Sequence, residues 1–134
     1  MKKTLKCFFV LLFILPLSLQ ACPNLAGKYF CLIEDGHREP WLDLMTIEQA
    51  VHPDLPGVTN FTTNYRSIPG GEETFSADDT GIADGWGWII KCTADTVVSV
   101  RNDFSAISEL FIDKDHNLVR TYNYQIQQTC SPKR

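Results

Sequence analysis

Short runs of β-prone residues, interrupted by turn-forming residues about every ten positions, are the feature that most constrains the fold of this chain. After residue 22, no stretch sustains an apolar period of about 3.6 residues over a helical length, although residues 41–50 could form one short helix. The pattern therefore predicts an all-β fold. The expected strands are Lys28–Glu34, Trp41–Gln49, Asn60–Ile68, Glu72–Ala77, Gly85–Cys92, Thr96–Arg101, Ala106–Asp113 and Leu118–Gln128.

The links between these expected strands are short and rich in Gly, Pro, Asn and Asp. Such links join antiparallel neighbours, because a parallel crossover needs about a dozen residues or more. The strands should therefore form a meander, whose two exposed edges are removed when the sheet closes on itself. We expect an antiparallel meander that closes into a small up-and-down β-barrel of about eight strands, with a two-sheet β-sandwich as the alternative.

The first residues have the order of a secretory signal peptide. Lys2, Lys3 and Lys6 precede the apolar run Cys7–Leu15, and a small-residue stretch ends at Ala21. The apolar run is too short to span a membrane, which takes about 20 residues. We therefore expect residues 1–21 to be a signal peptide and residues 22–134 to be a single domain that is secreted or periplasmic.

Four cysteines remain after the expected signal, and an even set in an exported domain predicts two disulfides. Cys22 and Cys31 lie close in sequence, so a local bridge between them is plausible and would leave Cys92 to pair with Cys130; the sequence leaves the other pairings open. The stretch before Cys22 also reads as a loose lipobox, so a lipid-anchored envelope protein is an alternative. Lipidation would leave an odd thiol, which favours plain cleavage.

Charge and motifs exclude several functions. Removal of residues 1–21 takes three lysines and changes the formal charge from −4 to −7, which disfavours nucleic acid and anionic membranes as partners. The histidines stand singly beside turn residues, and Asp113–Asn117 begins like a calcium loop but continues as a polar hairpin turn. We expect no enzyme activity, no metal and no cofactor; the oligomeric state stays open.

Aromatic residues carry the strongest functional signal. In Gly85-Trp86-Gly87-Trp88, two tryptophans share one face of an expected strand, with glycines that allow close approach to the rings. Facing inward they would line a pocket or fill the core, whereas facing outward they would stack on sugar rings and indicate a protein or glycan interaction module. Tyr122 and Tyr124 are expected on one face of the last strand.

The segment Asn24–Tyr29 resembles the Gly-x-Trp opening of lipocalins, fatty-acid-binding proteins and avidins, with Tyr29 where these families have Trp. In those barrels the aromatic residue packs beneath an Arg from the last strand, and Arg120 lies on the expected last strand here, near its start. The resemblance implies a calycin-type barrel that carries a small apolar or amphipathic molecule and is not a catalyst. The candidate ligand-binding residues are Tyr29, Trp86, Trp88, Tyr122 and Tyr124.

Overall fold

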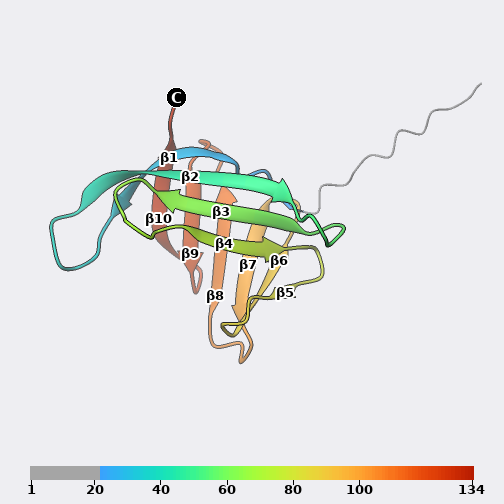
Figure 1. Cartoon of the computed structure of the whole chain (residues 1–134). Helices are drawn as coiled ribbons and strands as arrows, with labels where there is room; N and C mark the ends of the chain where they lie inside the picture. The colour runs from blue at the N-terminus through green and yellow to red at the C-terminus, as the bar shows by residue number, and fades with distance from the viewer. Residues whose placement is uncertain (1–21) are drawn as a thin grey trace, which may run out of the picture.

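The computed structural model describes residues 22–134, and the predicted signal peptide lies outside the described residues. The described chain is all β, as predicted, and residues 41–50 belong to a strand rather than a helix (Figure 1). The strands are β1 (Gly27–Ile33), β2 (Trp41–Val51), β3 (Thr59–Tyr65), β4 (Glu73–Ala77), β5 (Ile82–Ala83), β6 (Trp88–Cys92), β7 (Thr96–Arg101), β8 (Ile107–Ile112), β9 (Leu118–Tyr122) and β10 (Gln125–Pro132).

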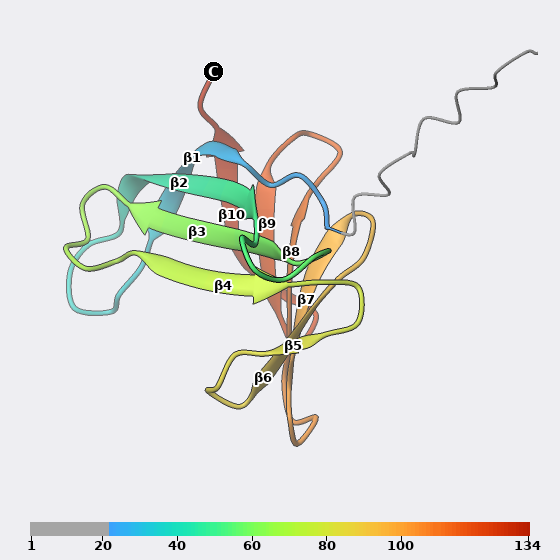
Figure 2. The same cartoon turned by 45° about the vertical axis from the view of Figure 1, so that its right-hand side comes forward.

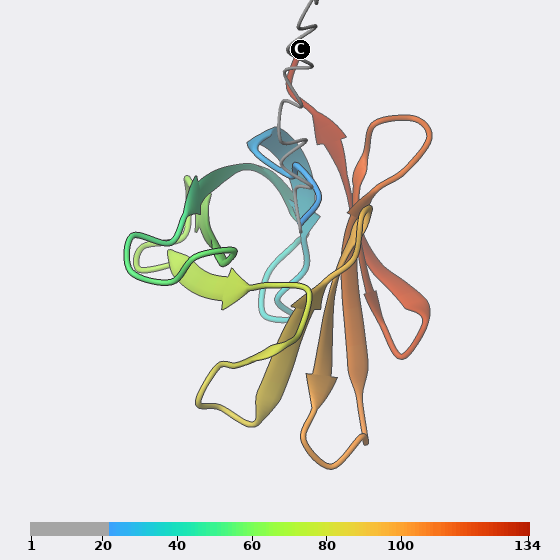
Figure 3. The same cartoon turned by 90° about the vertical axis from the view of Figure 1, so that its right-hand side faces the viewer.

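All ten strands belong to one sheet, in the order β4-β3-β2-β1-β10-β9-β8-β7-β6-β5. The first strand pairs with the last, so the seam of the barrel lies between β4 and β6. There, one parallel bridge joins Asp78 to Lys91, and the amide of Cys92 donates to the carbonyl of Asp78 at 2.6 Å. In Figure 3 the green strands face the orange strands across the interior. The sheet is therefore a nearly closed antiparallel barrel.

The strand count is ten rather than about eight for two reasons. The expected strand 118–128 is broken by a tight turn in which Asn123 and Tyr124 have φ angles of 47° and 65°. The expectation that Tyr124 continues the face of Tyr122 is therefore wrong. The loop after β4 contains the two-residue strand β5, which pairs with β6 beyond the edge of β4 (Figure 2).

Two disulfides are buried in the core, but not in the pairing that sequence proximity suggested. Cys22 is bonded to Cys92 and Cys31 to Cys130, so the expected Cys22–Cys31 bridge is wrong. Cys31 and Cys130 are direct partners in the β1–β10 ladder, which brings their side chains together on one face. All four cysteines are buried within one apolar core that includes Leu25 and the stacked rings of Phe61 and Phe75.

Within residues 22–134, no helix is long and apolar enough to span a membrane.

Candidate functional site

A cavity of about 960 Å³ lies between β4 and strands β5–β9, on the side of the barrel where the seam is incomplete. Its apolar lining includes Ile90, Val97 and Leu110, which are buried members of the core. Strand alternation places these residues on the inner face, because Val97 and Leu110 are direct partners across β7 and β8. The cavity is therefore continuous with the core rather than a hollow on the outer surface.

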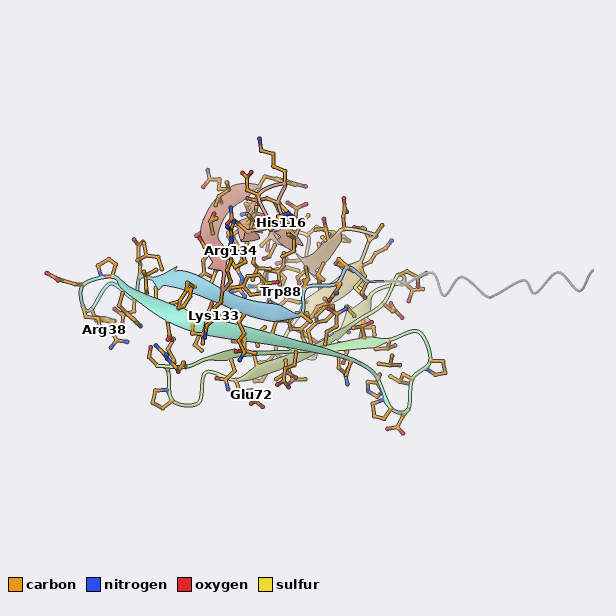
Figure 4. All side chains as sticks on the ribbon, turned by 90° about the horizontal axis from the view of Figure 1, so that it is seen from above. Arg38, Glu72, Trp88, His116, Lys133 and Arg134 are labelled. Atoms are coloured by element: carbon orange, nitrogen blue, oxygen red, sulfur yellow. A yellow bond between two sulfur atoms is a disulfide. The ribbon has the colours of Figure 1, made fainter. Side chains whose placement is uncertain are left out.

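Aromatic residues form part of the cavity lining, to which Phe75, Trp86, Trp88 and Tyr122 all contribute. Trp88 begins β6 and lies near the middle of the molecule in the view of Figure 4. The guanidinium of Arg101 lies 5.6 Å from the centre of the Trp88 ring. Tyr122 ends β9, directly opposite Ser108, which also lines the cavity.

The turn before β6 is built to present Trp86. Gly85 and Gly87 have φ angles of 82° and 93°, a region that glycine adopts without steric cost. Asp84 Oδ1 accepts hydrogen bonds from the amides of Trp86 at 2.7 Å and Trp88 at 3.1 Å. The Asp84 carboxylate thus holds the backbone of the turn through two hydrogen bonds, while Trp86 remains 87% exposed.

Arg120 is the one basic side chain among the residues that line this cavity. It is half-buried on β9, opposite Leu110 and on the same face as Leu118 and Tyr122. Among residues 22–134, no side-chain hydrogen bond or ion pair engages its guanidinium. An arginine on an inner face can form charge-assisted hydrogen bonds with any anionic group that enters.

Most of the carboxylates that line the cavity have hydrogen-bond partners in the chain, unlike Arg120. Glu109 accepts a hydrogen bond from the Thr121 hydroxyl at 3.1 Å, and Asp84 is engaged by the two backbone amides of its turn. Glu73 is exposed at the start of β4. Two of these three acidic groups are therefore satisfied by the chain itself, whereas the guanidinium is not.

Of the five residues predicted to bind a ligand, three line this cavity and two do not. Tyr29 is buried, and its hydroxyl donates to the carbonyl of Leu25 at 2.9 Å; burial raises the pKa of this phenol. Its ring folds back over Gly27, where an added Cβ would lie 3.1 Å from the Tyr29 hydroxyl oxygen. Tyr124 is exposed in the β9–β10 turn.

Sequence reasoning placed Arg120 on a strand but did not assign it to the cavity. The available signal was its position between Leu118 and Tyr122 on one alternating face, where a cation is unexpected unless something pairs with it. The β4 residues Glu73 and Phe75 carry no comparable local signal. They reach the cavity because the sheet curls and brings β4 opposite β6.

The acidic loop between β8 and β9 folds as a polar hairpin turn. Asp113 accepts hydrogen bonds from the amides of Asn117 and Asp115 and from the Asn117 side chain, and these bonds hold its pKa below the usual value. Across residues 22–134, no three His, Cys, Asp or Glu side chains are grouped to hold a metal ion.

Comparison of the chain with protein-family models, with curated proteins and with solved structures finds no match, so the cavity must be interpreted from its own geometry.

Proposed function

We propose that this chain binds a small amphipathic molecule in the cavity beside the β4–β6 seam and that it does so without catalysis. The observation that carries the proposal is the combination of an apolar floor, four aromatic rings and one unpartnered guanidinium in a single cavity of about 960 Å³. Ligand cavities in proteins typically have volumes of about 300 to 1,000 Å³. The lining of this cavity mixes apolar and polar side chains, which suits a molecule that has both an apolar and a polar part.

The polar end of the ligand should be anionic. A half-buried guanidinium has lost part of its hydration, and a carboxylate can satisfy it through two parallel hydrogen bonds. The apolar part would then lie against Leu110, Ile90 and the Trp88 ring, which supply binding energy through burial of apolar area. The favoured ligand class is a small acid with an aliphatic or aromatic body.

Export and a calycin-type relationship belong to the same proposal. Two buried disulfides are compatible with folding in an oxidising compartment. The sulfur of Cys22 is already bonded to Cys92, which supports a soluble carrier over a chain anchored by a lipid on that sulfur. The nearly closed barrel is consistent with a calycin-type carrier, although Tyr29 packs within the core rather than against the ligand cavity.

The test compares three amphiphiles that share one tail: dodecanoate, dodecanol and dodecyltrimethylammonium. Binding is followed by tryptophan fluorescence and by titration calorimetry at concentrations below micelle formation. Dodecanoate should bind most tightly, and Arg120→Gln should weaken dodecanoate binding by about tenfold or more, since a hydrogen bond to a charged group contributes about 1.5 to 3 kcal/mol. The same substitution should leave dodecanol binding nearly unchanged.

The matched control is Arg66→Gln, which removes the same charge from an exposed position outside the cavity. Equal binding of all three amphiphiles would contradict the anionic ligand class. If none of them binds, and native mass spectrometry of protein recovered from an oxidising export compartment finds no additional non-covalent mass, the carrier proposal is wrong.

A second candidate is a glycan-interaction module, and the exposure of Trp86 favours it. An indole held outward by a rigid turn offers a flat apolar face on which a sugar ring can stack. Titration with soluble oligosaccharides separates the two functions: a fluorescence change that is lost in Trp86→Ala but unaffected by Arg120→Gln would favour the module.

A further inference from the structure

Three aromatic side chains project from the tips of three separate turns. Trp86 lies in the β5–β6 turn, Phe104 in the β7–β8 turn and Tyr124 in the β9–β10 turn, and their exposed fractions are 87%, 83% and 75%. We call these three residues the aromatic tips. Large apolar side chains that are this exposed and share one region of a surface mark an interaction site.

Strand pairing brings the three turns to the same end of the barrel. Trp88 pairs with Arg101, which places the β5–β6 turn beside the β7–β8 turn, and the amide of Asn102 donates to the carbonyl of Gly87 at 2.8 Å. The amide of Asn123 likewise donates to the carbonyl of Ile107 at 2.7 Å, which joins the third turn to the second. In Figure 1 these turns lie at the lower end of β6–β9.

The lining of the cavity reaches this end of the barrel. Trp86 and Tyr122 line the cavity, and each belongs to, or directly borders, one of the three turns. The aromatic tips are therefore not scattered over the surface. They lie at the end of the barrel that the cavity lining reaches.

At two of the aromatic tips, a bulky residue occupies a backbone conformation that usually favours glycine. Phe104 and Tyr124 have φ angles of 58° and 65°, in the left-handed region where glycine or asparagine is usual and a bulky residue is uncommon. Both residues are mostly exposed, so packing against the core does not explain the choice of an aromatic side chain. A bulky, exposed residue in this backbone conformation points to a function outside the folded chain.

The chemistry of this end favours a lipid interface as its partner. Tryptophan and tyrosine prefer the boundary between water and lipid, because an apolar ring and a polar atom can each find a suitable environment there. Tips on separate turns can enter a deformable lipid layer independently, whereas a protein partner usually covers one continuous, closely packed face. An amphipathic ligand would also be concentrated in such a layer.

The charges beside the tips indicate which kind of lipid surface fits. The carboxylate of Asp103 lies 4.0 Å from the guanidinium of Arg101, and Asp84 is engaged by the amides of its own turn. None of the three turns contains a lysine, so this end lacks the basic cluster that an anionic membrane attracts. A zwitterionic surface, which imposes no such requirement, is the appropriate partner.

We propose that the aromatic tips dock this end of the barrel onto a zwitterionic lipid interface, from which the cavity takes up its ligand. The docking step can be tested by itself, but the uptake step rests on the proposed function. Trp86 would enter the interface while also lining the cavity, whereas Phe104 and Tyr124 would act only in docking.

The test uses phosphatidylcholine vesicles and the double variant Phe104→Gly/Tyr124→Gly, since glycine fits both backbone conformations and neither residue lines the cavity. Vesicle flotation should show wild-type protein bound, and brominated phosphatidylcholine should quench its tryptophan fluorescence. The double variant should bind vesicles about tenfold more weakly or worse, because two apolar anchors are lost. Its affinity for dodecanoate in water should be unchanged.

The matched control is Leu42→Ser/Val51→Ser, which removes two apolar side chains that are 68% and 78% exposed on β2. This control should bind vesicles as the wild type does. The docking proposal is overturned if wild-type protein does not float with vesicles, if both double variants lose binding equally, or if the tips are needed for a soluble glycan or protein instead. Vesicle binding without dodecanoate binding would overturn the carrier function alone.

Discussion

At the scale of single residues, two charged side chains inside the barrel differ in whether the chain supplies hydrogen-bond partners for them. Asp43 is 1% exposed and accepts hydrogen bonds from Ser67 and Leu44, so the chain itself satisfies the buried carboxylate. Arg120 is half-buried and has no such partner within the described chain. A charged group with hydrogen-bond partners in the chain contributes to stability, whereas a charged group without them is available to bind a ligand.

Asp43 should make the free energy of unfolding depend on pH in the acidic range. Burial opposes ionisation, but the hydrogen bonds from Ser67 and Leu44 outweigh burial and hold the pKa of Asp43 below its ordinary value of 3.8. Because the folded pKa is lowered, the stabilisation is present above about pH 3.8 and is lost as pH falls through the folded pKa. Asp43→Asn should cost about 1 to 3 kcal/mol at neutral pH, since an amide hydrogen would face the Ser67 donors.

Urea unfolding of wild type and Asp43→Asn across this pH range measures the difference. The gap between the two proteins should begin to narrow as pH falls below about 3.8 and should close once pH falls through the lower folded pKa of Asp43, where the wild-type carboxyl becomes protonated in the folded protein. A gap that stays constant with pH would mean that Asp43 acts through packing rather than through its charge.

Tyr124 should cost stability. Asn123 and Tyr124 both have positive φ angles in a two-residue hairpin turn, where Asn-Gly is the favoured pair. Tyr124→Gly should therefore raise the free energy of unfolding by roughly 0.5 to 1 kcal/mol, read from the urea midpoint. The same change at Tyr65, a half-buried strand residue whose hydroxyl donates to Gln128, should destabilise. Loss of stability in Tyr124→Gly would mean that the ring packs on the barrel in solution.

At the scale of strands and turns, local pattern predicted most of the architecture. Strand β7 has the expected ends, and the expected strands before β5 correspond to β1–β4 with small shifts at their ends. The β9–β10 turn was missed because tyrosine is a strand-forming residue and seldom occupies a left-handed turn, so the run 118–128 reads as one strand. Strand β5 was missed because two residues are too few to show alternation.

The turn that leads into β5 gives a prediction at this scale. Gly81 has a φ angle of 103°, and an added Cβ would lie 2.9 Å from Ile89 Cγ2, whereas Gly85 has a φ angle of 82° and open space around it. Both Gly81→Ala and Gly85→Ala should lower stability by about 1 kcal/mol through the backbone. Gly81→Ala should lower it further because β5 must move away from β6.

Hydrogen exchange of the β6 amides, together with urea unfolding, distinguishes the two variants. Faster exchange at Ile90 in Gly81→Ala, but not in Gly85→Ala, is the expected result, because Ile82 is the direct ladder partner of Ile90. Equal losses in both variants would show that the steric contact is relieved by rotation of the Ile89 side chain.

At the scale of the whole molecule, the sequence predicted a barrel but not where the barrel stays open. The seam falls between β4 and β6, rather than between the first and last strands, because β1 and β10 pair directly. That pairing joins residues far apart in the chain, and no local pattern encodes it. The composition of the cavity follows from the same long-range closure, which is why Arg120 and Phe75 could not be assigned together from sequence alone.

Stability of the whole barrel should depend on both disulfides. They join residues 70 and 99 positions apart, and the loop-entropy model gives each bridge roughly 4 to 5 kcal/mol. Total stability of a domain is about 5 to 15 kcal/mol, so reduction should unfold the protein or leave it marginal. Melting temperatures measured by circular dichroism with and without dithiothreitol test this dependence. The melting temperature of Cys22→Ala/Cys92→Ala should lie between those of the oxidised and the reduced wild-type protein. An unchanged melting temperature after full reduction would contradict it.

The same two bridges have a consequence for biogenesis. Cys22 and Cys31 are the first of the four bridge-forming cysteines to be synthesised, yet neither is the other's partner, and Cys130 lies four residues before the last. Oxidation in the order of synthesis would form a non-native bridge between Cys22 and Cys31. Correct maturation therefore requires either that Cys22 and Cys31 stay reduced until Cys92 and Cys130 are available or that a disulfide isomerase reshuffles an early bridge.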